Sequence, residues 1–196
     1  MISKTNKNIK RAFDVLLAVF LIPLAIVPLV LFLVLATIDT KQIGLFSQKR
    51  VGKNAKLFKI YKIRTLKKGK HILGHLDDYA SKHGKFLRAY KLDELPQLFN
   101  VLIGDMSFVG PRPDIEGFAD ALEGEDIMIL EIKPGVTGPA TIKYKNEEDL
   151  LALQDDPENY NRTIIWKDKV EINKMYIKDW SFYLDLKYIL QSIFSK

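Results

Sequence analysis

The chain reads RAYKLDELPQLFNVLIGDMSFVGPRP from Arg88 to Pro113. Two neighbouring carboxylates, Asp93 and Glu94, lie in this stretch among basic residues, and Arg112 follows between two prolines. This combination suits phosphate chemistry, because a carboxylate can attack phosphorus or hold a divalent metal while a guanidinium neutralises phosphate oxygens. A simpler interpretation is a solvated helix cap, since acidic residues are favoured in the first turn of a helix. The stretch alone leaves both interpretations open.

Local signals predict a helix over the middle of this stretch. Apolar residues recur at helical spacing from Phe86 to Leu102, and Pro96 is tolerated only in the first turn of a helix. The acidic pair is therefore expected at a helix N-terminus, where free N–H groups and the helix dipole attract phosphate and keep carboxylates ionised. Gly104 is expected to end the helix, and the flanking prolines are expected to hold Arg112 in a stiff extended turn.

The preceding segment predicts a small β-ribbon with a basic face. A turn signal, VGKN, occupies residues 51–54, and apolar residues alternate with lysines from Leu57 to Ile63. The ribbon is interpreted either as a phosphate or headgroup surface beside a membrane, or as an edge strand whose lysines prevent edge pairing. For Arg50 and Arg64 we favour phosphate contact, because a guanidinium can donate two parallel hydrogen bonds.

A long apolar segment lies near the N-terminus. Between Val15 and Ile38 no charged residue occurs, and as a straight helix this run covers about 36 Å against a hydrocarbon core of about 30 Å. Pro23 and Pro28 are expected to bend or break the helix, and flanking basic residues favour both ends on the cytoplasmic side. We therefore predict a helical hairpin that enters one leaflet and returns. A single-pass span ranks second and a cleaved signal peptide third.

Composition limits the remaining classes of protein. The 196 residues suffice for one domain with a core, and the net charge of +6 fits a partner that carries phosphates. The chain contains no cysteine, which excludes disulfides, thiolate catalysis and cysteine-based zinc sites. The three histidines lie in a polar segment from Lys67 to Lys85, which is expected to be a loop or a short exposed helix.

Five motifs together indicate a family. They are FxQxRxG at residues 46–52, YKxRT at 61–65, LDELPQLxNVL at 92–102, GDMSxVGPRP at 104–113 and KPGVTG at 133–138. With these motifs the chain closely resembles the bacterial sugar transferase family, the monotopic phosphoglycosyl transferases. The resemblance extends over nearly the whole chain, from the proline-containing apolar segment to the tail that begins at Trp180.

The resemblance implies an enzyme that moves a sugar-1-phosphate from a UDP-sugar to a polyprenyl phosphate such as undecaprenyl phosphate. This transfer, with Mg²⁺ and a covalent enzyme intermediate, begins glycoconjugate assembly. Asp93 matches the nucleophile, Glu94 its metal-binding neighbour and Arg112 a phosphate-contacting arginine. Carboxylate attack on the β-phosphorus would give an acyl phosphate and release UMP, and cations must offset the repulsion between the two anions. Further candidates for phosphate binding are the nearby basic residues Arg88, Arg64, Lys62 and Arg50.

The C-terminal part departs from the family pattern. After Gly138, where many relatives carry Trp-Ala-Gln, this chain has PATIKY and then an acidic insert at residues 146–160. The insert is interpreted either as a determinant of sugar choice or as a capped surface helix followed by a solvated loop. Asn173 stands where relatives often place an aspartate. The tail from Trp180 to Phe194 is expected to be a helix, either at the membrane interface or packed in the core.

We thus predict an α+β, mainly helical fold with a small β-ribbon and interfacial amphipathic helices around an active site at the membrane surface. Residues 1–40 are expected to form a membrane-anchoring hairpin and residues 41–196 a cytoplasmic catalytic domain. The expected partners are a UDP-sugar, polyprenyl phosphate and the cytoplasmic face of the bacterial inner membrane, without nucleic acid, and a homodimer is compatible with the sequence. The alternative function is a non-enzymatic, membrane-anchored basic module that binds anionic lipid or nucleic acid.

Overall fold

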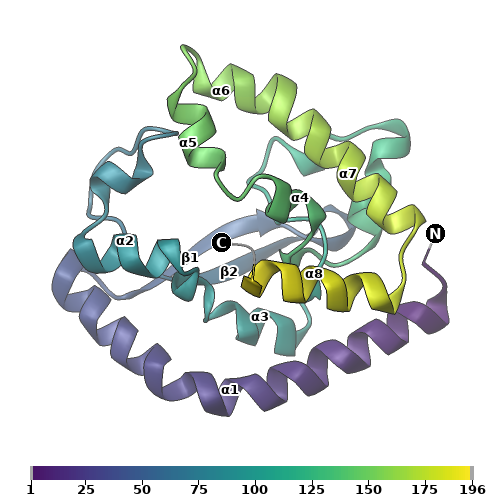
Figure 1. The fold of residues 1–196 in the computed structure, drawn as a ribbon, viewed down its shortest axis with the longest axis horizontal. Helices are drawn as coiled ribbons and strands as arrows, with labels where there is room; N and C mark the ends of the chain where they lie inside the picture. The colour runs from purple at the N-terminus through teal and green to yellow at the C-terminus, as the bar shows by residue number, and fades with distance from the viewer. Residues whose placement is uncertain (1, 195–196) are drawn as a thin grey trace.

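Helices surround two small sheets in the computed structural model, which describes residues 2–194 (Figure 1). The α-helices are α1 (Lys4–Thr40), α2 (Lys82–Ala89), α3 (Gln97–Ile103), α4 (Pro139–Lys143), α5 (Glu147–Ala152), α6 (Pro157–Tyr160), α7 (Trp166–Lys178) and α8 (Phe182–Phe194). Short helical turns are η1 (Lys53–Ala55), η2 (Leu76–Tyr79), η3 (Leu92–Glu94), η4 (Ala119–Ala121), η5 (Gly124–Glu131) and η6 (Asn161–Ile165), the last with π-helical geometry. The strands are β1 (Leu45–Val51), β2 (Leu57–Ile63), β3 (Ser107–Val109) and β4 (Gly135–Thr137). The predicted α+β, mainly helical fold is confirmed.

The helix α1 continues through both Pro23 and Pro28. Figure 1 shows that it bends near its middle, so that two arms run along one side of the molecule. Proline removes a backbone donor and crowds the carbonyl four residues earlier, which bends a helix that packing holds together. Of the two predicted outcomes, a bend or a break, the structure therefore has the bend.

The two sides of α1 differ in exposure. Its inner side packs into two apolar clusters, one through Ala18 and the other through Leu29 and Ala36. Its outer side exposes large apolar residues such as Leu16 and Val27, each more than 70% exposed. By length and composition α1 could cross a membrane, and only 11% of its most apolar window is buried within the protein. Exposed apolar surface of this extent marks contact with a membrane or another protein, so the one-leaflet hairpin stays a prediction.

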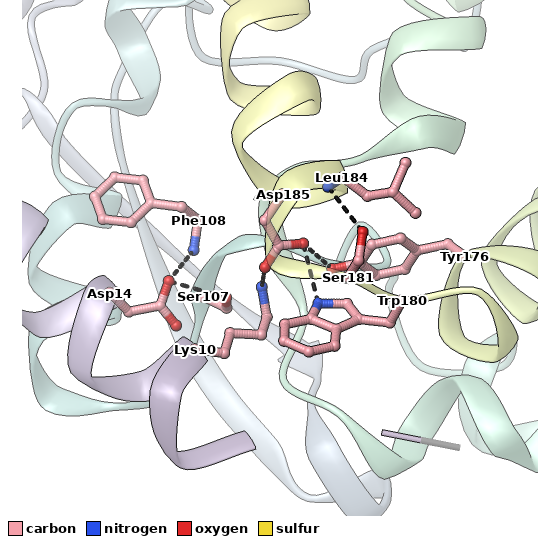
Figure 2. Close-up of polar contacts among 9 residues, drawn as sticks. All are labelled: Lys10, Asp14, Ser107, Phe108, Tyr176, Trp180, Ser181, Leu184 and Asp185. Atoms are coloured by element: carbon pink, nitrogen blue, oxygen red, sulfur yellow. Dashed lines mark hydrogen bonds and ion pairs between the residues drawn. The ribbon is translucent and has the colours of Figure 1, made fainter. Parts of the chain in front are cut away.

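An anchoring cluster of buried polar groups ties α1 to the rest of the chain (Figure 2). It consists of two carboxylates and the groups that donate to them, namely Lys10, Asp14, Ser107, Phe108, Tyr176, Trp180 and Asp185. Asp185 on α8 accepts from the Lys10 ammonium at 2.6 Å, the Tyr176 hydroxyl at 2.6 Å and the Trp180 indole at 3.2 Å. Asp14 on α1 accepts two hydrogen bonds from the start of β3. The cluster thus joins α1, α7, α8 and β3.

The predicted β-ribbon is present: β2 has the expected bounds, and β1 includes Val51, the first residue of the predicted turn. Strands β1 and β2 pair antiparallel, and Leu45 faces Ile63 in the register. Both faces of β2 pack against the protein, because Ile60 belongs to the first apolar cluster and Ile63 to the second. Lys62 lines the cleft and Lys59 is exposed. The second sheet, β3 with β4, is parallel and was not predicted.

The helix predicted from Phe86 to Leu102 is two helices in the structure. The helix α2 begins at Lys82, earlier than expected, and ends at Ala89, after which Lys91 adopts a left-handed conformation with φ of 54°. The 3₁₀ turn η3 and then α3 follow. The predicted end at Gly104 is confirmed, because this residue caps α3 with φ of 97°, a value that glycine adopts without strain.

The tail forms the predicted helix, α8. Its inner side, including Tyr188 and Ile189, packs against the main apolar cluster, which confirms core packing for that side. Its outer side exposes Tyr183 and Phe194. Because this side is apolar and aromatic, contact with the membrane interface remains a prediction for it.

Candidate active site

A large cleft lies between the β1–β2 ribbon, the η3 turn and helices α4 to α7, with a volume of about 1190 Å³. All seven side chains that were expected to act in catalysis or phosphate binding line it: Arg50, Lys62, Arg64, Arg88, Asp93, Glu94 and Arg112. They come from five places in the chain, namely β1, the end of β2, α2, η3 and the turn after β3, which the fold brings together. A cleft of this volume can hold a substrate much larger than a single phosphate.

The acidic pair is positioned by the apolar residues on either side of it. Leu92 and Leu95 pack into the second apolar cluster, against the C-terminal arm of α1. Asp93 and Glu94 lie between them on the η3 turn and line the cleft. They therefore precede α3 by one turn, close to the predicted position at a helix start. The simple interpretation of a solvated cap is wrong, since Asp93 is only 7% exposed.

Asn100 fixes α3 against the ribbon, a role that the sequence motif did not reveal. Its side chain accepts a hydrogen bond from the backbone N–H of Tyr61 at 3.1 Å and donates to the carbonyl of Lys59 at 2.7 Å. Its own carbonyl accepts from the backbone after α3. A fully buried amide with both ends satisfied is a rigid link, so the η3 turn is held at a set distance from β2.

Glu94 is an ionised carboxylate between two cations. Its Oε1 atom accepts from the Lys62 ammonium at 2.7 Å and from the Arg112 guanidinium at 3.1 Å. Burial would raise the pKa of Glu94, but the charges of Lys62 and Arg112 together outweigh it and lower the pKa to about 2. Its second oxygen, Oε2, makes no hydrogen bond to any of residues 2–194.

Asp93 lies in a different environment from its neighbour. Its carboxylate has no hydrogen bond or ion pair with the residues that the structure describes. Burial raises the pKa of Asp93 to about 6, against the opposing effect of the Lys62 charge. An anion that is poorly solvated and not hydrogen-bonded keeps its lone pairs available, which suits a nucleophile.

The Arg112 turn is held by close backbone contacts with β4. The N–H of Gly110 donates to Thr137 at 2.9 Å, and the N–H of Gly135 donates to the Pro111 carbonyl at 2.8 Å. A Cβ atom on Gly110 would come within 2.5 Å of a backbone oxygen, so only glycine fits there. This packing explains why the KPGVTG and GPRP motifs occur together, and it holds the turn against β4.

The remaining basic candidates line the cleft without touching the acidic pair. Arg50 donates to the Pro113 carbonyl at 3.3 Å and so braces the arginine turn. Arg64 donates to the Ile43 carbonyl at 2.9 Å. Arg88 forms an ion pair with Asp77 at 2.8 Å, on the loop between β2 and α2. Direct contact with Glu94 is thus confined, among these five cations, to Lys62 and Arg112.

Two further cleft residues were not assigned a role from the sequence. Asp114 follows the arginine turn, and burial raises its pKa to about 6 despite the nearby charges of Lys169 and Arg50. Lys91 immediately precedes η3, and burial lowers its pKa. The signal that could have identified both is their adjacency to the motif residues, but adjacency alone does not reveal which side chains face the cleft.

The acidic insert forms part of the cleft wall. Residues 147–152 form α5, whose Glu147 pairs with Lys169 of α7 at 2.7 Å, and Glu148 accepts the backbone N–H of Gly74 at 3.1 Å. The predicted surface helix is present, although the Asn146 side chain does not cap it. The part expected to be a solvated loop includes the helix α6, which also lines the cleft.

The donor set around Glu94 fits Mg²⁺. No group of three or more histidine, cysteine or acidic residues capable of holding a metal occurs among residues 2–194. Mg²⁺ is ordinarily bound by one or two carboxylates together with substrate phosphates and water, so it needs no such group. The ionised Glu94 has an uncommitted oxygen in the cleft, and Asp93 lies beside it. The three histidines are exposed, as predicted, and none belongs to a metal-holding group among residues 2–194.

Known proteins resemble this chain over almost its full length. The family described as bacterial sugar transferase matches residues 5–196. An uncharacterized sugar transferase EpsL of Bacillus subtilis is 32% identical over 188 residues, which is 94% of this chain and 85% of that protein. The UDP-glucose:undecaprenyl-phosphate glucose-1-phosphate transferase of Escherichia coli is 34% identical over 98% of this chain. The UDP-N-acetylgalactosamine-undecaprenyl-phosphate N-acetylgalactosaminephosphotransferase of Aeromonas hydrophila is 33% identical over 94% of it.

The lengths of these proteins differ. This chain spans 41% of the Escherichia coli protein and 43% of the Aeromonas protein. In contrast, it spans most of the Bacillus protein, whose length is similar. The match covers the apolar helix, the ribbon, the acidic pair and the arginine turn together. This chain therefore belongs to the bacterial sugar transferase family.

Proposed function

We propose that this protein transfers a sugar-1-phosphate from a UDP-sugar to a polyprenyl phosphate, such as undecaprenyl phosphate, through a covalent intermediate on Asp93. The observation that carries the proposal is a contrast inside the cleft. Asp93 has no hydrogen bond or ion pair with residues 2–194, whereas Glu94 is held between Lys62 and Arg112. Two of the relatives are named as transferases that use undecaprenyl phosphate and a UDP-sugar, which supports the same class of reaction here.

The reaction has two balanced steps. In the first, an oxygen of Asp93 forms a bond to the β-phosphorus, the bond to the bridging oxygen breaks, and UMP leaves with that oxygen. In the second, an oxygen of the lipid phosphate attacks the same phosphorus, the bond to Asp93 breaks, and the carboxylate is regenerated. One pyrophosphate linkage is replaced by another, so the transfer needs no further energy source.

The residues of the cleft offset the charge that this reaction gathers. Lys62 and Arg112 are placed to neutralise phosphate oxygens as Asp93 approaches, and Arg50 keeps the arginine turn in position. Mg²⁺ held by Glu94 would reduce the negative charge of the diphosphate. Arg88 and Arg64 line the cleft wall, and we propose that they bind the phosphate of the donor that Asp93 does not attack.

Activity is tested with detergent-solubilised protein, a polyprenyl phosphate, Mg²⁺ and a panel of UDP-sugars. UMP release is expected from the wild type with at least one sugar. The relatives are named for different sugars, glucose and N-acetylgalactosamine, so the panel must include both. A membrane-anchored basic module without enzymatic activity would release no UMP with any sugar and would refute the proposal.

The proposed location is the cytoplasmic face of the bacterial inner membrane, with α1 entering a single leaflet. The bend in α1 and its exposed apolar side support this arrangement. Tags placed at residue 1 and residue 196 are expected to be accessible from the cytoplasm, as measured with an impermeant labelling reagent on intact and permeabilised cells. Labelling of one end only in intact cells would mean that α1 spans the membrane.

A further inference from the structure

Lys91 carries a positive charge in the cleft that no group among residues 2–194 neutralises by direct contact. Its ammonium has no hydrogen bond or ion pair with residues 2–194, although the charges of Glu94, Arg112 and Asp93 act on it. Lys62 and Arg88, by contrast, each form an ion pair with a carboxylate of the protein, Glu94 and Asp77 respectively. Lys91 is therefore a cation available to an anionic ligand beside the nucleophile.

The backbone of Lys91 supports the same conclusion. With φ of 54° and ψ of 23° it lies in the left-handed region, which costs a residue with a Cβ atom about 1 kcal/mol and favours glycine or asparagine. The turn is held by hydrogen bonds from its N–H to the Arg88 carbonyl and from the Glu94 N–H to its own carbonyl. This conformation connects α2 to η3 and directs the Lys91 side chain into the cleft.

An exposed aromatic surface adjoins Lys91 on the α2 side. Phe86 and Tyr90 are 50% and 66% exposed, and their rings pack together at 4.9 Å. The helix α2 that carries them contacts α1, the helix with the long apolar outer side. Aromatic rings with this exposure are typical of the interface between a membrane and water. Lys91 thus lies between a surface suited to lipid and the carboxylate of Asp93.

We propose that Lys91 binds the phosphate of the polyprenyl acceptor, an inference that rests on the proposed function. A lysine ammonium suits a terminal phosphate monoester, because it is a compact charge that donates in several directions. Lys62 and Arg112, which contact Glu94, are assigned to the donor diphosphate. Lys91 offsets the repulsion when the acceptor oxygen approaches the phosphosugar on Asp93, so it acts in the second step only.

The two steps can be measured separately. Exchange of radiolabelled UMP into the UDP-sugar needs the donor alone and reports the first step. For Lys91→Met we expect exchange within about twofold of wild type and a KM for polyprenyl phosphate raised about tenfold or more, the effect of losing one charge-assisted contact. Lys91→Arg should recover most of the loss. Lys85→Met, which replaces an exposed lysine on the neighbouring helix α2, should change neither quantity.

Each result decides the assignment. If UMP exchange falls in Lys91→Met by the same factor as turnover, Lys91 serves the donor and the assignment is overturned. An unchanged KM for the acceptor would also overturn it. Absence of UMP exchange in the wild type would refute the two-step reaction itself, and with it this role of Lys91. A structural role would lower exchange and turnover together, and Lys91→Arg would not restore the KM.

Discussion

The carboxylates of the anchoring cluster and those of the cleft are all largely buried, but they differ in their partners. Asp185 is 1% exposed and accepts three hydrogen bonds through its two oxygens, and Asp14 accepts two through one oxygen. Asp93 is 7% exposed and accepts none from residues 2–194. A buried charge without hydrogen bonds is costly, whereas a charge with a full set of donors is tolerated.

The difference separates stability from chemistry. Hydrogen bonds to an anion lower its energy and also its reactivity, so the anchoring cluster is suited to hold helices in place. Burial raises the pKa of Asp93, and its lone pairs stay free because it accepts no hydrogen bond from residues 2–194. The cleft thus stores an unfavourable interaction at the position where the proposed reaction needs a nucleophile, as functional sites often do.

Replacing Asp93 with asparagine should have the largest effect on activity and the opposite effect on stability. We expect UMP release to fall by about 10³-fold or more, because the neutral amide does not form the acyl phosphate. The pKa of Asp93 is raised from 3.8 to about 6, so its penalty is absent below pH 4 and complete above pH 6. Asp93→Asn should therefore raise the melting temperature at pH 8. The free energy of unfolding should increase by at most about 3 kcal/mol.

Glu94→Gln is the matched control for Asp93→Asn. The pKa of Glu94 is lowered from 4.5 to about 2, so its ionised form stabilises the fold above pH 4.5 and that stability is lost as the pH falls through about 2. At pH 8 this variant should have lower activity and also a lower melting temperature, whereas Asp93→Asn should have lower activity and a higher melting temperature. If Asp93→Asn also melted at a lower temperature, the carboxylate would be structural and the contrast between the two acids would fail.

Replacing Asp185 with asparagine should reverse the pattern of Asp93→Asn. The Lys10 ammonium would stay buried without its partner, since its side chain is 9% exposed, which ordinarily costs about 3 to 5 kcal/mol. Thermal unfolding in detergent should show a large loss of stability. Donor-dependent UMP exchange per folded molecule should stay near the wild-type value. The double replacement Lys10→Met with Asp185→Leu should recover part of the stability, and an unaltered melting temperature in Asp185→Asn would show that the cluster does not anchor α1.

Local features of the fold could be predicted from sequence, but long-range features could not. The alternation from Leu57 to Ile63 and the glycine at residue 104 act within a few residues, and both were located correctly. The pair of Lys10 and Asp185 joins residues 175 positions apart, and no local pattern records it. The separation of α2 from α3 depends on Lys91 in a conformation that lysine seldom adopts, so helical spacing alone predicted one helix.

In the candidate site, the sequence motif located the two acidic residues but did not reveal which of them has hydrogen-bond and ion-pair partners. Sequence places Asp93 and Glu94 side by side and suggests one nucleophile and one metal ligand. Which acid has partners depends on Lys62 from β2 and Arg112 from the turn after β3, and these meet Glu94 only in the folded chain. The assignment of roles to Lys62, Arg64 and Arg88 remains a prediction for mutagenesis.

The pH dependence of the first step provides the finest test of the contrast between Asp93 and the anchoring cluster. Attack requires ionised Asp93, so the rate of UMP exchange at low donor concentration should fall about tenfold for each pH unit below about 6. Glu94, whose pKa is about 2, stays ionised throughout that range and does not change the rate by titrating. The melting temperature should be followed on the same samples between pH 5 and 8, where the anchoring cluster should keep the fold intact. A rate that stays constant down to pH 5 would mean that Asp93 is as well satisfied as Asp185, and the proposed division between anchoring and reactive carboxylates would then be wrong.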